Sequence, residues 1–491
     1  MRSNFRPLLV LTLLLAVAGV AAAPASAGAA CDVGLPDAAS TCKTGLRGAW
    51  EELFPSIGRI QYEGPDSDTP LAFHYYNAEE VVHGKPMREW LRFSMAYWHT
   101  IRADGSDPFG AATKRWPWEQ HPAGDDVELA FRRMRAFFEL LDKLGVDFWC
   151  FHDRDIAPEL PTLADTNAAL DQVVALAKEL QAASGKRVLW GTAQLFKHPR
   201  YMHGAATSPN ATVFAHAAAQ VKKAMEATKE LGGENFVFWG GREGYQTLLN
   251  TDLALEQHNL ARFLRMAADY KRKLGLPGPL LLEPKPQEPA KHQYDFDVST
   301  TAAFLLRHGL DKDFKLNIEC NHATLAGHSC YHELETAAML GLLGSIDANS
   351  GDPQTGWDTD QFPTDIRETT LMMLTVLRQG GLAPGGLNFD AKLRRESTAI
   401  EDLVLAHISG MDAMARGLRN AARLLEDGVL ERMRAQRYSS WRDTQLGRDI
   451  TAGKVGLEDL ERVALAQPEP FDSLPSGQQE LYEIQLSRYV R

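Results

Sequence analysis

The sequence predicts an α/β protein, a (β/α)8 TIM barrel followed by a C-terminal helical arm. Eight short apolar runs lie between residues 91 and 392, helical patterns separate them, and such runs stop after residue 395. The runs are continuously apolar, as expected for parallel strands covered on both faces. Strand–helix repetition implies βαβ units, and a count of eight favours a closed barrel. The alternative is an open doubly wound sheet, but no G-x-G-x-x-G turn follows the first run.

The strands and one helix can be placed along the chain. The expected strands are 91–98, 146–153, 187–194, 235–241, 279–286, 314–321, 344–350 and 386–392. Between the first two, apolar residues recur at helical spacing from Ala130 to Leu144, and Gly145 is a typical end for that helix.

A single apolar stripe marks the predicted arm. Its residues are Ile408, Met411, Met414, Leu418, Ala421 and Leu425. Gly428 is a plausible end for this helix. The stripe must be covered, either by the outside of its own barrel or by a neighbouring subunit.

We expect four parts: a leader (1–27), a leader-proximal segment (28–53), the catalytic barrel domain (54–395) and the arm (396–491). The leader begins with two arginines and an apolar run, and it ends in Ala-Ser-Ala, which is typical of a secretory signal. The run is shorter than the roughly 20 residues of a membrane span. We therefore expect an exported, periplasmic protein that is not anchored in a membrane.

Composition excludes some function classes. The chain has 491 residues, of which 44% are hydrophobic and 24% charged, as in an ordinary globular protein. A net charge of -12 argues against nucleic acid or an anionic membrane as a partner.

The five cysteines give two expectations. Cys31 and Cys42 could form a small disulfide in an oxidising compartment. Cys150, Cys320 and Cys330 lie in or beside apolar runs, which favours small buried side chains. No spacing suggests a zinc site built from cysteines.

Polar residues follow the ends of the predicted strands, and most of them are carboxylates. In a parallel barrel these ends meet on one face, where active sites lie. The candidate metal ligands are Glu283, Glu319, His322, Asp347, Asp358, Asp360 and Asp390. Oxygen donors with one imidazole suit Mg²⁺, Mn²⁺ or Co²⁺. The donors are too many for one octahedral ion, so we expect two divalent cations, with Glu319 as the natural bridge.

Three further groups could carry chemistry at this face. Asp155 could orient His152 for proton transfer with a sugar hydroxyl, although most such pairs are surface pairs. Lys285 could polarise a carbonyl or simply neutralise Glu283. Aromatic residues at the strand ends belong either to the core or to a platform for a sugar: Trp98, Phe196 and Trp239.

Seven segments, in order, resemble the longer-chain subclass of the xylose isomerase family. They are FHDRD, WGTAQLFKHPRYMHGAATSPN, WGGREGYQTLLNTD, LLEPKPQEPAKHQYDFD, NIECNHATLAGHS, GSIDANSGDPQTGWDTDQFP and GGLNFDAKLRR. The likeness runs from about Phe54 to the C-terminus. It implies an aldose–ketose isomerase that converts D-xylose to D-xylulose, and also D-glucose to D-fructose, by a metal-assisted hydride shift after ring opening.

The resemblance also implies a role for each matching residue. The first ion would be held by Glu283, Glu319, Asp347 and Asp390, and the second by Glu319, His322, Asp358 and Asp360. His152 with Asp155 would open the pyranose ring, and Lys285 would hydrogen-bond the carbonyl oxygen. Trp98 and Trp239 would form an apolar wall, and Phe109 would enter a neighbour's site. The family forms tetramers through its arm, so we expect a homotetramer.

The chain departs from the family pattern in four places. Gln194 replaces a usual Asn, Gln246 a common Glu, and Cys320 a small apolar residue. We expect activity to be retained, with altered sugar preference. The fourth departure is the leader, since members of the family are normally cytoplasmic, and a cytoplasmic location is therefore the alternative to export.

Two functions of other classes remain as alternatives. A two-metal hydrolase or endonuclease could use the same barrel, but it would need a basic groove and more histidine ligands. A non-catalytic exported sugar-binding protein would not need two cations and a positioned lysine.

Overall fold

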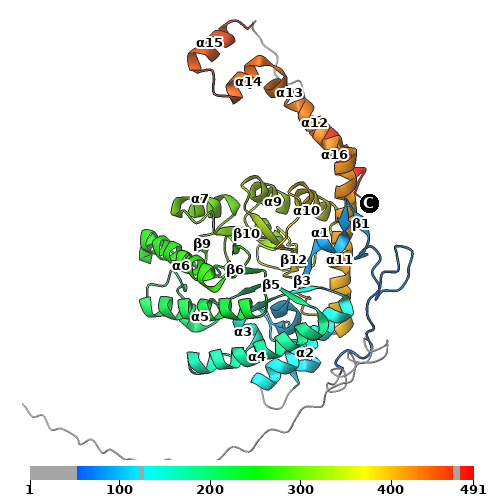
Figure 1. The fold of residues 1–491 in the computed structure, drawn as a ribbon, viewed down its shortest axis with the longest axis vertical. Coiled ribbons are helices and arrows are strands. Elements are labelled where there is room, and N and C mark those ends of the chain that lie inside the picture. Colours follow the sequence, from blue (N-terminus) through cyan, green and yellow to red (C-terminus); the bar gives the residue numbers. More distant parts are fainter. Residues whose placement is uncertain (1–51, 121–125, 468–475, 491) are drawn as a thin grey trace, which may run out of the picture. The chain divides into compact units, whose positions relative to one another are not determined.

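A closed barrel of parallel strands forms the centre of the protein (Figure 1). The computed structural model describes residues 52–120, 126–467 and 476–490. The strands follow the order β10-β11-β12-β3-β4-β5-β6-β8, and each neighbouring pair is parallel. Their bounds are β3 Phe93–Ala96, β4 Phe148–His152, β5 Arg187–Thr192, β6 Asn235–Trp239, β8 Leu280–Glu283, β10 Phe314–Glu319, β11 Leu343–Asp347 and β12 Leu387–Phe389. Each overlaps the run that predicted it, so the (β/α)8 barrel is confirmed.

Helices surround the strands (Figure 1). The longer ones are α2 Val127–Leu144, α4 Leu163–Ser184, α5 Ala211–Glu230, α6 Leu253–Leu274, α7 Val298–His308, α9 Cys330–Met339 and α10 Ile366–Arg378. Short helices are α1 Met87–Leu91, α3 Asp153–Ile156 and α8 Cys320–Leu325, and two short antiparallel pairs join β1 Val81–Val82 to β2 Lys85–Pro86 and β7 Gly244–Tyr245 to β9 His292–Gln293. Helix α2 ends at Gly145 as predicted, because glycine readily takes the left-handed conformation found there (φ 65°).

Side chains fill the inside of the barrel. The buried interior cluster consists of Phe148, Cys150, Leu189, Trp190, Val237 and Leu281. A filled barrel has no pore, so chemistry is left to the strand ends at its mouth.

The stripe of helix α11 (Ile400–Asp427) is covered by its own barrel. From Ile408 to Ala421 its apolar residues are buried, and α11 packs along α10. The two helices approach closely at Gly417, where a Cβ atom would lie 2.6 Å from the backbone of Thr369. The sequence left two possibilities for what covers this stripe, and the structure shows that it packs against its own barrel.

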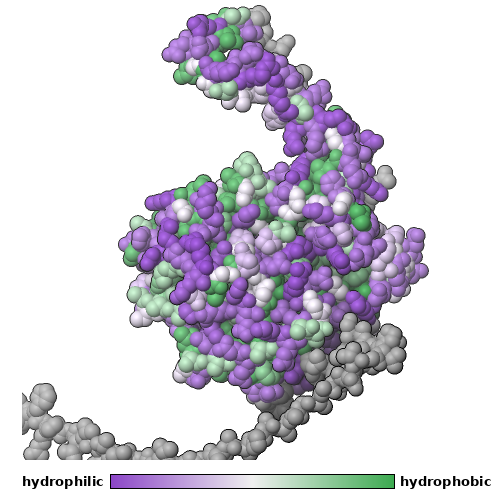
Figure 2. Space-filling model, viewed as in Figure 1, coloured by the Kyte–Doolittle hydropathy of each residue, from purple (hydrophilic) through white to green (hydrophobic). Residues whose placement is uncertain are grey.

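The rest of the arm is exposed. Its helices are α12 Val429–Arg437, α13 Ser439–Asp443, α14 Gln445–Thr451, α15 Leu457–Leu465 and α16 Gln479–Ser487. Leu457 and Leu465 of α15 are 84% and 80% exposed, and Trp441 is 50% exposed. Figure 2 shows apolar side chains of this segment among polar ones. Within the described parts of the chain, none of the helices is both long and apolar enough to cross a membrane.

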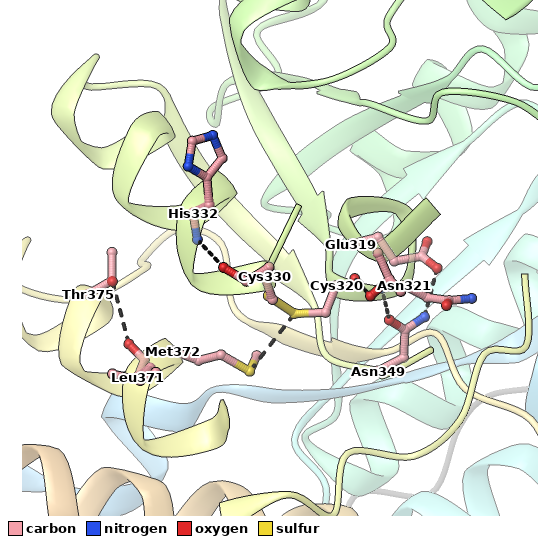
Figure 3. The surroundings of a disulfide bond; sticks show 11 residues. Glu319, Cys320, Asn321, Cys330, His332, Asn349, Leu371, Met372 and Thr375 are labelled. Carbon is pink, nitrogen blue, oxygen red and sulfur yellow. Dashed lines mark hydrogen bonds between the residues drawn. A yellow bond between two sulfur atoms is a disulfide. The ribbon is translucent and has the colours of Figure 1, made fainter. Parts of the chain in front are cut away.

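Two of the cysteines expected to be free are joined. Cys320 and Cys330 are buried as predicted, but they form a disulfide, which corrects the expectation of two separate small side chains (Figure 3). The bond ties the start of α8 to the start of α9, and Cys320 also contacts Met372. Cys150 is buried and free. The leader and the Cys31–Cys42 pair lie outside the described residues.

We predict that Cys330→Ala lowers the free energy of unfolding by about 3 kcal/mol without a reductant, because the disulfide restricts the unfolded chain. Urea denaturation of both proteins, with and without reductant, measures this difference. With reductant the gap should shrink to the smaller cost of one missing thiol. An equal gap in both buffers would show that the bond does not form in solution.

Candidate metal centre

Four carboxylates converge at the barrel mouth. Glu283, Glu319 and Asp347 are the last residues of β8, β10 and β11, and Asp390 follows the end of β12. One oxygen from each of the four lies within 4.8 Å of the others. The parallel register places Glu319 directly beside Asp347. The structure thus brings together the four residues that the sequence suggested for one ion.

A second group shares Glu319. An oxygen of Glu319 lies within 4.8 Å of oxygens from Asp358 and Asp360, and the loop after β11 carries these two residues. His322 lies beside them, with Nε2 3.2 Å from Glu319 Oε2 and 3.1 Å from Asp358 Oδ2. Asp360 adopts a left-handed backbone (φ 45°), which is unusual for a non-glycine residue and is often found at functional sites.

The four carboxylates of the first group disfavour one another's ionisation. Burial and the neighbouring charges of Asp347 and Asp390 raise the pKa of Glu283 well above its usual value. Burial, followed by Asp358 and Asp390, does the same to the pKa of Glu319. Since like charges at short range oppose ionisation, either protons or a cation must offset them.

His322 is oriented as a metal-binding histidine would be. Its Nδ1 lies 3.0 Å from the carbonyl oxygen of Pro284, which can only accept a hydrogen bond, so Nδ1 carries a proton. Its Nε2 faces the oxygens of Glu319 and Asp358. A bound cation satisfies all three donor atoms at once, and backbone support of the other ring nitrogen is typical of metal-bound histidine.

Buried asparagines support the cluster, and of these only Asn349 was among the polar residues expected at a strand end. The Nδ2 of Asn317 donates to Glu283 Oε2 (3.0 Å) and to Asp347 Oδ2 (2.6 Å). Further bonds run from Asn349 to Glu319, from Asn388 to Asp347 and from Asn321 to Asp358. A polar amide inside an apolar strand, as in KLNIE or GLNFD, was the available signal.

Two cationic groups lie on the same side: His99, which the sequence did not suggest, and Lys392, which is one of the polar residues that follow the predicted strands. His99 Nε2 lies 2.8 Å from Asp390 Oδ1 and 3.2 Å from Asp360 Oδ2. Burial alone would lower the pKa of His99, but Asp390 and Asp360 outweigh it and raise the pKa to about 9. Lys392 Nζ contacts Asp360 at 2.7 Å. No sequence spacing connects His99 to these aspartates.

On the opposite side of the mouth, His152 and Asp155 meet as the sequence suggested. His152 Nδ1 lies 2.8 Å from Asp155 Oδ2. Gln194, one of the departures from the family pattern, donates to both oxygens of Asp155 at 3.0 and 3.1 Å. Gln246, another of the four departures, is exposed.

A row of aromatic rings connects this pair to Lys285. Ring centroids lie 4.3 Å apart for Trp98 and His152, 5.5 Å for His152 and Phe196, and 4.6 Å for Phe196 and Trp239. Lys285 Nζ lies 5.1 Å from the Trp239 ring and 2.5 Å from Asp358 Oδ2. Burial would lower the pKa of Lys285, but Asp358 and Glu288 raise it, so the group stays charged.

Phe109 is not part of this arrangement. It is 82% exposed, and its ring contacts Trp357, which is 50% exposed. Within one chain, Phe109 thus contacts the residue next to Asp358 and takes no part in the row of rings.

The donor set fits hard or borderline divalent cations. Carboxylate oxygens dominate, one imidazole joins them, and no thiolate is present among the clustered residues. The donors exceed the six ligands of one octahedral ion, and Glu319 belongs to both groups.

Comparisons with known proteins agree with this geometry. A family model described as a xylose isomerase-like TIM barrel matches residues 138–362, and one described as the XylA2 C-terminal domain matches residues 434–490. The chain is similar to a xylose isomerase of Hordeum vulgare (60% identity, covering 96% of each chain). It is also similar to one of Arabidopsis thaliana (61%, covering 90% of this chain and 94% of the relative) and one of Thermotoga neapolitana (56%, covering 89% and 98%).

We predict that Glu319→Gln stabilises the folded protein in EDTA but destabilises it, relative to wild type, when Mg²⁺ is present. The pKa of Glu319 is higher in the folded than in the unfolded protein. Glu319 therefore stabilises the fold fully below its unfolded pKa of about 4.3, and this stabilisation is lost as pH rises towards the folded pKa. In EDTA the variant should therefore melt progressively higher than wild type as pH rises above 4.3. With Mg²⁺ at pH 7.5, wild type should melt higher, because ion binding stabilises the folded state. The same order in both buffers would contradict a shared cation site.

Proposed function

The chain belongs to the xylose isomerase family, and we propose that it converts D-xylose to D-xylulose, and D-glucose to D-fructose less readily, with two divalent cations. It is an aldose–ketose isomerase. The observation that carries the proposal is the meeting, at one barrel mouth, of the carboxylate cluster, the His152–Asp155 pair and Lys285.

Two overlapping ligand sets would hold the cations, with Mg²⁺ the first candidate and Mn²⁺ or Co²⁺ the alternatives. The first set is Glu283, Glu319, Asp347 and Asp390, and the second is Glu319, His322, Asp358 and Asp360. When bound, such ions act as Lewis acids that stabilise negative charge developing on the sugar oxygens. The amides of Asn317, Asn349 and Asn388 fix the carboxylates in position for this.

His152 is suited to open the sugar ring. Its bond to Asp155 occupies Nδ1, so Nε2 is left for a substrate hydroxyl. Burial would raise the pKa of Asp155, but its hydrogen bond and proximity to His152 lower it, so this carboxylate stays ionised. Gln194 donates two further hydrogen bonds to the same carboxylate and holds it in place.

Lys285 and the aromatic row prepare the open chain for isomerisation. The charged Nζ of Lys285 can donate to the carbonyl oxygen of the sugar, where negative charge develops as a hydride moves between adjacent carbons. Trp98, Phe196 and Trp239 offer apolar faces to the C–H surface of the sugar and keep water from it.

We further propose a homotetramer assembled through the arm. The apolar side chains of α13 to α16 are exposed in one chain, and such surface favours contact with another copy. In such an assembly Phe109 would reach the mouth of a neighbouring subunit, which would account for its exposure in a single chain.

The four-part organisation and export remain proposals based on the sequence. The basic, apolar and small-residue pattern of residues 1–27 supports a cleaved signal and a periplasmic location. Residues 28–53, 54–395 and 396–491 would form the linker, the catalytic barrel and the arm.

The relatives do not favour the two alternative functions. Neither a two-metal hydrolase nor a non-catalytic sugar binder accounts for identities of 56–61% to xylose isomerases over about nine-tenths of the chain. The deciding experiment incubates the protein with D-xylose and Mg²⁺ and measures ketose, with EDTA as the control. Ketose that forms with Mg²⁺ and not with EDTA supports the proposal, and sugar binding without turnover overturns it.

We predict that Asp358→Asn lowers kcat for D-xylose about 100-fold or more at limiting Mg²⁺, since even supporting residues around a metal contribute 10- to 100-fold. Its melting temperature in EDTA should also fall, because Asp358 pairs with the buried Lys285, but the loss of turnover should be far larger than the loss of stability. Asp352→Asn is the matched control, because Asp352 is an exposed residue of the same loop. Wild-type turnover in Asp358→Asn would refute its assignment as a ligand.

We also predict that replacing Leu457 and Leu465 together by serine dissociates the tetramer, since both are almost fully exposed on α15 of one chain. Light scattering after size exclusion gives the mass of each variant. Glu461→Ser, on the same helix, should leave the mass unchanged. A double variant that remains tetrameric would exclude α15 from the interface.

A further inference from the structure

Outside the barrel mouth, two histidines and two carboxylates meet where α7 and α9 begin. His328 precedes α9, and His332 and Glu333 lie in its first turn. Donor atoms of these three residues lie within 4.8 Å of one another. Asp297, the N-cap of α7, places Oδ2 3.6 Å from Nε2 of His328. In the described residues this is the one such group that contains none of the residues at the mouth.

Backbone hydrogen bonds hold each carboxylate with one oxygen free. Glu333 Oε2 accepts from the N–H of Val298 at 2.8 Å, and Oε1 lies 3.9 Å from Nε2 of His332. Asp297 Oδ1 accepts from the N–H of Thr300 at 2.7 Å, and its Oδ2 faces His328. Supporting bonds of this kind orient ligands at metal sites before the ion arrives.

The spacing of the donors leaves room for an ion. Separations of 3.6 and 3.9 Å between ring nitrogen and carboxylate oxygen are too long for direct hydrogen bonds. Two ligand atoms about 2.0–2.1 Å from a tetrahedral zinc ion lie roughly 3.3 Å apart, so binding would draw the donors closer and turn at least one of the two stacked imidazole rings towards the ion. The two imidazole rings are parallel within 9° at 4.6 Å, and Figure 3 shows the ring of His332 directed away from the disulfide.

We propose that His328, His332, Glu333 and Asp297 form a third cation site, selective for a borderline metal such as Zn²⁺. Two imidazoles and two carboxylates are a typical tetrahedral donor set for zinc, whereas Mg²⁺ prefers six oxygens. The histidine side chains are 31% and 52% exposed, which gives ions access, while that of Glu333 is only 5% exposed.

The role of this site is structural. It would tie the start of α7 to the start of α9, beside the disulfide that already joins α8 to α9. Asp297 and Glu333 also line a small pocket together with Glu319 and His322. An ion here would therefore stabilise helix α8, which carries His322, from the side that faces away from the barrel mouth.

Equilibrium dialysis of the full-length protein against low-micromolar ZnCl₂ in excess Mg²⁺, followed by elemental analysis, tests the site. Wild type should bind one zinc ion per chain more than His332→Gln, whose zinc affinity at this site should fall at least about 100-fold. His258→Gln, an exposed histidine of α6, should match wild type. Glu319→Gln should still bind this zinc ion, although its cation sites at the barrel mouth are weakened. Equal zinc content in wild type and His332→Gln would overturn the proposal.

Anomalous diffraction at the zinc edge gives an answer that does not depend on any variant. A crystal of the wild-type protein equilibrated with zinc and Mg²⁺ should show a peak bounded by the two histidines, Glu333 and Asp297. Zinc peaks confined to the barrel mouth would rule the site out.

Discussion

The burial of several carboxylates at one barrel mouth is the constraint on which the rest of the site depends. Glu283, Glu319 and Asp347 are each at most 4% exposed, and their pKa values are raised by burial and by neighbouring carboxylates such as Asp390. Amides of neighbouring asparagines offset part of this cost, but amides carry no net charge. Divalent cations would supply the missing positive charge, and the same arrangement that opposes folding in their absence would then favour binding them.

Strand order divides the mouth into two sides. The consecutive strands β8, β10, β11 and β12 end in acidic residues. The other four, β3 to β6, deliver Trp98, His152, Phe196 and Trp239 at or beyond their ends. A sugar between the two sides would meet charge on its oxygens and aromatic faces on its carbons. Closure of the barrel therefore places a charged side opposite an aromatic side, although no long-range sequence pattern encodes this arrangement.

The fold was predictable because each strand is a local apolar run and each long helix a local periodic one. The acidic cluster was predictable too, since each member follows a strand end. His99 was not, because its contacts to Asp360 and Asp390 join segments far apart in the chain. The Cys320–Cys330 disulfide was equally hidden, because pairing depends on how α8 meets α9. What the sequence could not predict are contacts that depend on how elements pack in three dimensions and that follow from no local pattern.

Anomalous diffraction from crystals equilibrated with Mn²⁺ tests the central claim most directly. The account predicts two manganese peaks per chain at the mouth, both within bonding distance of the Glu319 carboxylate, one beside Asp347 and the other beside His322. A mouth without manganese, or ions that do not share Glu319, would contradict it.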